Sequence, residues 1–170
     1  MEAYERRGCS GSTSPCEEVF SEEVGGMIVC LHRSGGLLGA LIRWQTRSPY
    51  SHASMLIEGK HYESVAGKGV VRSPLSKSAE LFLVDGIDDT SAASFVDKQL
   101  GKGYDYSSVL RFVSRKQASR KSSRKWFCSE LVYATCQKGG IELLRAVAPW
   151  EVSPGMLSRS PLLKEMKSGV

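Results

Sequence analysis

Apolar and polar residues alternate through the middle of the chain in a pattern that predicts neighbouring β-strands. Residues 52–57, "HASMLI", alternate between two faces, and the "EGK" that follows is a tight-turn signal. Residues 60–65 continue as the returning strand of a hairpin, and two more short apolar runs follow at 69–75 and 79–86. This part of the sequence therefore predicts an antiparallel meander.

Helical patterns flank the meander. Residues 37–46, "LLGALIRWQT", follow a short apolar strand at 25–32 and carry apolar residues at helical spacing. Residues 88–103 open with capping residues and close with glycine, and another helix starts at Cys128 and ends at two glycines. These elements predict an α+β fold in which a curled antiparallel sheet of about five to six strands packs against the Cys128 helix.

The chain of 170 residues predicts one folded domain at 23–170, preceded by a polar, flexible arm at 1–22. The segment 114–125 contains six Lys and Arg residues and no acid, which predicts a mobile, solvated loop. The net charge of +5 favours anionic partners, and this basic loop could contact an anionic surface. The loop lacks interleaved aromatic residues, so nucleic-acid binding is not expected.

Several classes of protein are disfavoured by the sequence. The five cysteines are odd in number and form no CxxC pair, so neither a disulfide framework nor a structural metal site is expected. The glycine-rich "RSGGLLG" lacks the Lys of a phosphate-binding loop, and no cofactor is expected. No apolar run reaches about 18 residues, so no transmembrane segment is expected. The N-terminus lacks the apolar core of a signal peptide, which leaves a cytoplasmic location or export by a non-classical route.

Cys128 combines two features that a purely structural cysteine does not need. It follows Arg124 and Lys125 closely, and it opens a predicted helix. The N–H groups at a helix N-terminus stabilise a thiolate and could also hold an oxyanion. Cys128 is therefore a candidate nucleophile. A buried core cysteine is the competing interpretation, because free cysteine is frequently buried.

His52 and Glu63 are the candidates to complete a nucleophilic site. In the register that a tight turn imposes, Ser54 pairs with Glu63, and directly paired residues share a face of the sheet. His52 lies on the same face, and Glu63 is its diagonal neighbour at about 7–8 Å between Cα atoms. His52 would then act as the base, and Glu63 would orient its ring. His32 is an alternative base, whereas His61, beside the turn, is expected at the surface.

Three motifs, "YSHASMLI", "YES" and "WFCSELV", resemble in this order the circularly permuted papain-like hydrolases of the NlpC peptidase superfamily, in particular the YiiX-like group. In papain-like enzymes the cysteine helix precedes the histidine strand, whereas here the strand pair comes first. "YDY" and "SPGML" match that group as well, and the resemblance covers roughly residues 24–157. The basic loop at 114–125 departs from it, because it is longer and more charged than expected.

The resemblance implies a cysteine peptidase or amidase with Cys128 as nucleophile, His52 as base and then acid, and Glu63 as the orienting group. Tyr50 shares the face of His52 by parity and could contact the substrate, or it could be a packed strand aromatic. The implied substrate is an amide in a peptide or peptidoglycan-like crosslink, cleaved through a thioester. Two alternatives remain open: a lipid ester hydrolase or acyltransferase at an anionic membrane, and a non-catalytic binding module that retains the pocket.

Overall fold

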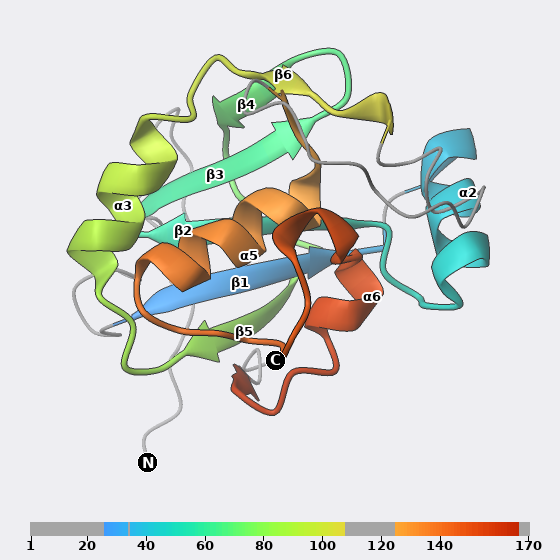
Figure 1. Ribbon diagram of the computed structural model, residues 1–170. Coiled ribbons are helices and arrows are strands. Elements are labelled where there is room, and N and C mark those ends of the chain that lie inside the picture. The colour runs from blue at the N-terminus through green and yellow to red at the C-terminus, as the bar shows by residue number, and fades with distance from the viewer. Residues whose placement is uncertain (1–25, 34, 108–124, 167–170) are drawn as a thin grey trace.

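The computed structural model describes residues 26–33, 35–107 and 125–166. A curled antiparallel sheet of six strands, in the order β4-β3-β2-β1-β5-β8, forms the centre of the described part (Figure 1). The strands are β1 (Met27–His32), β2 (His52–Ile57), β3 (Lys60–Val65), β4 (Gly69–Arg72), β5 (Glu80–Val84) and β8 (Leu163–Glu165). The sheet confirms the predicted α+β class.

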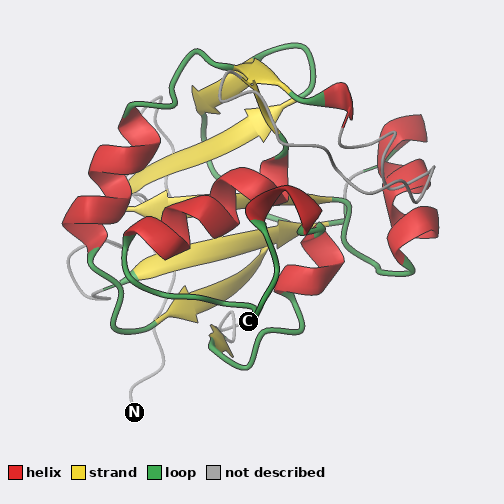
Figure 2. Ribbon diagram, in the orientation of Figure 1, coloured by secondary structure: helices red, strands yellow, loops and turns green. Residues whose placement is uncertain are grey.

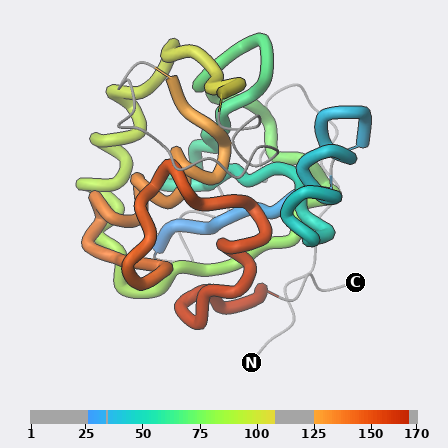
Figure 3. Tube along the Cα trace, turned by 45° about the vertical axis from the view of Figure 1, so that its right-hand side comes forward, coloured from blue at the N-terminus to red at the C-terminus, as the bar shows by residue number. Residues whose placement is uncertain are grey.

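Helices cover one face of this sheet (Figure 2). The helices are α2 (Gly36–Thr46), α3 (Asp89–Asp97), α5 (Cys128–Lys138), the 3-10 turn η1 (Pro149–Glu151) and α6 (Pro154–Leu157). Helix α5 crosses the strands, with α3 beside it on one side and α6 on the other, whereas α2 stands apart on the far side of the molecule from α3 (Figure 3). Two short parallel strands, β6 (Gly103–Tyr104) and β7 (Lys125–Trp126), lead the chain into α5.

The two faces of the sheet bury different sets of side chains. The alternate residues Val29, Met55 and Tyr62 face α3 and α5 and join the large core, where each of them is fully buried. The intervening residues of the same strands include Cys30 and Leu56, and they form a smaller cluster on the opposite face. Full burial of a large aliphatic side chain stabilises the fold by roughly 1.5–3 kcal/mol, so the strand alternation fixes which face the helices cover.

The hairpin between β2 and β3 sets the register that the candidate site depends on. Glu58 and Gly59 both adopt positive φ, 48° and 71°, as a two-residue turn that matches the strand twist requires. Ser54 consequently pairs with Glu63, which is the predicted register. The pairing places both side chains on the face opposite α5.

Two of the predicted segments fall outside the residues that the structure describes. The predicted arm at 1–22 and nearly all of the basic loop at 114–125 lie outside them, and only Lys125 is described, as the first residue of β7. The strand β8 was not expected from the sequence; it is only three residues long and pairs with the edge of β5. Among the residues described, no helix has the length and apolar character needed to cross a membrane.

Candidate functional site

The N-terminus of α5 presents Cys128 as the first residue of the helix. Phe127 precedes it in an extended conformation, and the backbone N–H of Phe127 donates a hydrogen bond to the Glu130 carboxylate. Ser129 donates a hydrogen bond from its hydroxyl to the carbonyl of Val152, at 2.6 Å, which ties the same turn to the loop before α6. These contacts hold the first turn of α5 in a fixed position, and with it the thiol of Cys128.

His52, the first residue of β2, links this thiol to a carboxylate. Its Nε2 donates to Oε2 of Glu63 across 2.9 Å, and the ring also makes a hydrogen bond with Cys128, for which Nδ1 is the remaining nitrogen. Burial lowers the pKa of His52, but the hydrogen bonds to Cys128 and Glu63 outweigh it and raise that pKa to about 10. The imidazole is therefore held as an imidazolium between the sulfur and the carboxylate.

Glu63 is held from its other side by Ser73, in the loop that follows β4. The hydroxyl of Ser73 donates to Oε1 of Glu63 across 2.5 Å, which leaves Oε2 to His52. The hydrogen bond from His52 lowers the pKa of Glu63 more than burial raises it, and with the bond from Ser73 the pKa falls to about 2. Glu63 is thus a carboxylate with both oxygens engaged.

A chain of polar side chains extends from Glu63 across the sheet. Nδ1 of His61 lies 2.8 Å from the carbonyl oxygen of Ser73, which can only accept, so Nδ1 carries a hydrogen. Nε2 of His61 lies 2.8 Å from the hydroxyl of Ser54, and this hydroxyl lies 2.7 Å from Nε2 of His32. The expectation that His61 is a surface residue is wrong: it is 3% exposed, because the loop around Ser73 packs against its ring.

His32, the alternative base, has a different environment from His52. The two rings lie opposite each other in the β1–β2 pairing, with centroids 5.2 Å apart. Burial lowers the pKa of His32 to about 4, and the nearby His52 and His61 contribute to this shift. His32 bonds to Ser54 rather than to the thiol, so the ring in contact with Cys128 is that of His52.

A polar cavity of about 230 Å³ opens on the carboxylate side of His52. The described residues that line it are the three histidines, Glu63, Arg33, Pro74, Ser76 and Ser78. The thiol of Cys128 is not among these lining groups. The cavity therefore gives water access to the hydrogen-bonded chain behind the imidazole and not to the sulfur.

The thiol itself lies beneath helix α2. Cys128 is 1% exposed and packs in a small cluster with Ile42, Tyr104 and Phe127. Leu38 and Leu41 of α2 pack against the same cluster. Among the described residues, side chains of α2 therefore cover part of the surroundings of the sulfur.

Tyr50 precedes β2 and is 8% exposed. Its hydroxyl donates a short hydrogen bond to the carboxylate of Glu80 in β5, and the guanidinium of Arg33 lies 5.6 Å from its ring centre. These contacts direct the hydroxyl toward β5. The substrate contact predicted for Tyr50 remains a prediction.

Sequence reasoning missed Ser73 and the role of His61 and His32 as members of one chain of hydrogen bonds. Ser73 lies in "VRSPL", where nothing in the residue pattern distinguishes it from an ordinary loop serine. The predicted β2–β3 register already places Ser54 and His61 on one face, whereas His32 joins them only through the β1–β2 pairing. The β1–β2 pairing needed for this argument is not evident from the sequence.

Comparisons with known proteins support the fold. No family model matches this sequence, and no curated protein matches it. Among solved structures, the chain is similar to the crystal structure of the metalloprotein YiiX from Escherichia coli O157:H7 (DUF1105), with a TM-score of 0.61 and 22% sequence identity. The match covers 84% of this chain and 95% of the other. The described architecture is therefore YiiX-like.

Proposed function

We propose that this protein is a cysteine hydrolase that cleaves an amide bond through a thioester intermediate. Cys128 is the nucleophile, His52 the base and then the acid, and Glu63 the group that orients His52. The observation that carries the proposal is the imidazole of His52, which is hydrogen-bonded to Cys128 on one side and to Glu63 on the other. The YiiX-like fold is compatible with such an enzyme.

In the proposed reaction the proton of the Cys128 thiol is already held by His52, so the reaction starts from a thiolate beside an imidazolium. The thiolate then attacks the carbonyl carbon of the substrate, and its π electrons move to the oxygen as an oxyanion. The N–H groups of the first turn of α5 point toward this position and stabilise the negative charge. Collapse of the intermediate breaks the C–N bond while His52 donates its proton to the leaving amine.

Water completes the cycle. His52, now neutral, removes a proton from a water molecule that attacks the thioester carbonyl. The C–S bond breaks, the acid product leaves, and the sulfur returns as a thiolate beside His52, which keeps the proton taken from water. Glu63 remains ionised throughout, because its low pKa of about 2 keeps it a carboxylate that stabilises the imidazolium.

The electrostatics of His52 favour an amide over an ester as the substrate. An amine leaves only when it is protonated, whereas an alkoxide leaves more readily without help from an acid. His52, hydrogen-bonded between Cys128 and Glu63, is placed to deliver that proton. The amide of a peptide, or of a peptidoglycan-like crosslink, is therefore the proposed substrate.

The protein of similar structure is described as a metalloprotein. A metal site in the present chain would need several His, Cys, Asp or Glu side chains directed at one point. Among the described residues, no group of three or more His, Cys, Asp and Glu side chains is arranged to hold a metal ion. Nε2 of His32 and Nε2 of His61 are both directed to the hydroxyl of Ser54, and Nδ1 of His61 carries a hydrogen. The histidines therefore do not fit a metal site in this arrangement, and no step is assigned to one.

A pair of substrates with the same acyl group tests the proposal. Purified protein is incubated with a peptide p-nitroanilide and the matching p-nitrophenyl ester, and the acyl-enzyme is trapped by acid quenching and located by peptide mass. The proposal predicts an adduct on Cys128 from both substrates, and turnover that is lost in Cys128→Ala. Full hydrolysis by Cys128→Ala would exclude it, and turnover of the ester alone would favour a lipid ester hydrolase. A non-catalytic binding module would give no adduct.

A further inference from the structure

The outer face of α2 exposes large apolar side chains. Leu37 is 93% exposed and Trp44 is 73% exposed, and these are the two highest values among the large apolar side chains of the described residues. The two residues are seven positions apart on one helix, so they project from nearly the same side. Ala40, between them, is exposed as well. The helix therefore carries an apolar strip that no part of the described structure covers.

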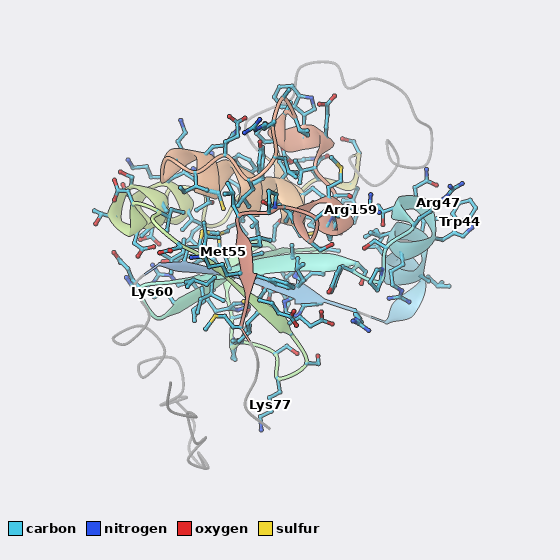
Figure 4. The ribbon with its side chains drawn as sticks, turned by 90° about the horizontal axis from the view of Figure 1, so that it is seen from below. Trp44, Arg47, Met55, Lys60, Lys77 and Arg159 are labelled. Atoms are coloured by element: carbon cyan, nitrogen blue, oxygen red, sulfur yellow. The ribbon has the colours of Figure 1, made fainter. Side chains whose placement is uncertain are left out.

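Positive charge lies at the C-terminal end of this apolar strip. Arg47 follows α2 directly and Arg43 lies in its last turn, whereas Arg33, before the helix, is paired with Glu80 at 2.6 Å. No acidic residue occurs anywhere from residue 24 to residue 57. Figure 4 shows Trp44 and Arg47 together at the outer end of α2, directed away from the sheet. The outer face of α2 thus combines exposed Leu and Trp side chains with arginines and lacks carboxylates on its own segment.

The opposite face of the same helix covers the candidate nucleophile. Ile42 packs with Cys128, and Leu38 and Leu41 pack against that cluster. One helix therefore has its inner face on the thiol and its outer face exposed. A surface that bound the outer face would lie on the other side of the helix from Cys128.

We propose that the outer face of α2 docks on an anionic lipid membrane. An interfacial helix places Trp and Leu at the boundary between headgroups and acyl chains, while its Arg side chains contact anionic headgroups. A folded protein partner would equally bury Leu37 and Trp44, but a segment that is cationic and free of acids over residues 24–57 is complementary to a surface of uniform negative charge. The docking does not depend on the chemistry at Cys128.

Vesicle flotation tests the proposal on the full chain. The probe is a set of vesicles of phosphatidylcholine alone or with about 30% phosphatidylglycerol, at low and high salt. We expect binding to the anionic vesicles that falls with salt. Leu37→Ser with Trp44→Ser lowers the partition coefficient by about tenfold or more, because the apolar contact is lost. Arg43→Gln with Arg47→Gln lowers it by about tenfold on anionic vesicles only.

Matched variants control for general effects of charge and apolar surface. Lys60→Gln with Lys77→Gln removes the same net charge from sites away from α2 (Figure 4), and Leu162→Ser removes an exposed leucine that is 46% accessible. Both controls are expected to bind vesicles as the wild type does. Circular dichroism checks that every variant is folded.

Three results would overturn the docking proposal: unchanged binding by the α2 variants, equal binding to neutral and anionic vesicles, or vesicle-independent dimerisation that Leu37→Ser with Trp44→Ser abolishes. The last result would assign the face to a second copy of the chain. The Cys128→Ala variant should bind vesicles as the wild type does. If the wild-type protein formed no adduct on Cys128 but still bound vesicles through α2, the proposed hydrolase would be contradicted. The docking proposal would then still hold.

Discussion

Ser73 donates its hydroxyl hydrogen to Glu63 across 2.5 Å, on the carboxylate oxygen that His52 does not use. The carboxylate is therefore fixed from two directions, and its second oxygen is aimed at the imidazole. Ser73 bonds to Glu63 and His61, and not to the sulfur of Cys128 or the ring of His52. We therefore assign it as a positioning residue for Glu63.

Ser73→Ala is expected to raise the pKa of Glu63 from about 2 toward its ordinary value of 4.5, because one of the hydrogen bonds that stabilise the carboxylate is lost. Carbon-13 NMR of the Glu63 carboxyl group measures this change directly. The alkylation rate of Cys128 at neutral pH should fall by about tenfold, the effect of losing one hydrogen bond to a charged group. Ser73→Thr should restore both values.

Ser76→Ala is the matched control, since Ser76 lines the cavity beside Glu63 and its hydroxyl bonds to Ser78. It should leave the pKa of Glu63 and the alkylation rate unchanged. A Glu63 pKa that is the same in Ser73→Ala and in the wild type would contradict the positioning role.

The ion pair of His52 and Glu63 predicts a bell-shaped pH dependence of stability. The pKa of Glu63 is lowered in the folded state, so its contribution is present above 4.5 and is lost as the pH falls toward 2. The pKa of His52 is raised, so its contribution is complete below 6.5 and is lost as the pH rises through 10. The full contribution of the pair therefore lies between about pH 4.5 and 6.5.

Urea denaturation of Glu63→Gln and the wild type over this pH range measures the difference. The free energy of unfolding of the variant should fall below that of the wild type by the largest amount between pH 4.5 and 6.5. This difference in free energy should become smaller below pH 4.5 and above pH 6.5. A gap that stays constant from pH 3 to 10 would show that the pair is not ionised as described.

Gly69 fixes the start of β4, the strand that pairs with β3 beside Glu63. Its φ is +77°, and an added Cβ would lie 2.1 Å from the carbonyl oxygen of Lys102. Gly67 has a similar φ of +82° but no atom within 4 Å of an added Cβ. Gly67→Ala should therefore cost about 1 kcal/mol of stability, the penalty of a left-handed backbone alone, whereas Gly69→Ala should cost several times more. Thermal unfolding of the two variants compares them, and equal losses would contradict the close approach.

Ile42 of α2 packs with Cys128 in one buried cluster, so it should limit access to the thiol from that side. Ile42→Ala should increase the alkylation rate of Cys128 several-fold, while the expected loss of stability of about 2–5 kcal/mol leaves the variant folded only under mild conditions. Ile42→Val serves as the milder variant with an intermediate effect. An alkylation rate in Ile42→Ala that is no higher than in the wild type would show that access does not run past this residue.

The part of the site that the sequence predicts rests on strand periodicity and turn chemistry. A two-residue turn at Glu58 and Gly59 allows one register, and this register pairs Ser54 with Glu63 as the structure has it. The two glycines at 139 and 140 likewise predict the end of the helix that opens at Cys128, which the structure gives as α5. Turn and helix-end preferences of this kind depend on a few neighbouring residues, so the sequence alone predicts them.

The remainder of the site depends on contacts between distant segments. His61 was expected at the surface because the turn is near, yet the packing of the loop around Ser73 buries it. His32 reaches the same chain of hydrogen bonds only because β1 pairs with β2, and the order of strands in a sheet is not encoded in the pattern of any single strand. Ser73 itself has no local signal.

The most direct test of the central claim is the alkylation rate of Cys128 between pH 5 and 9, measured by peptide mass in the wild type and in His52→Ala. Cys30 and Cys136 serve as internal references, because burial raises the pKa of each thiol to about 12. The account predicts that Cys128 is modified well before both of them near neutral pH, and that His52→Ala removes most of this advantage. A Cys128 that reacts no faster than Cys30 and Cys136, or that reacts equally fast without His52, would contradict it.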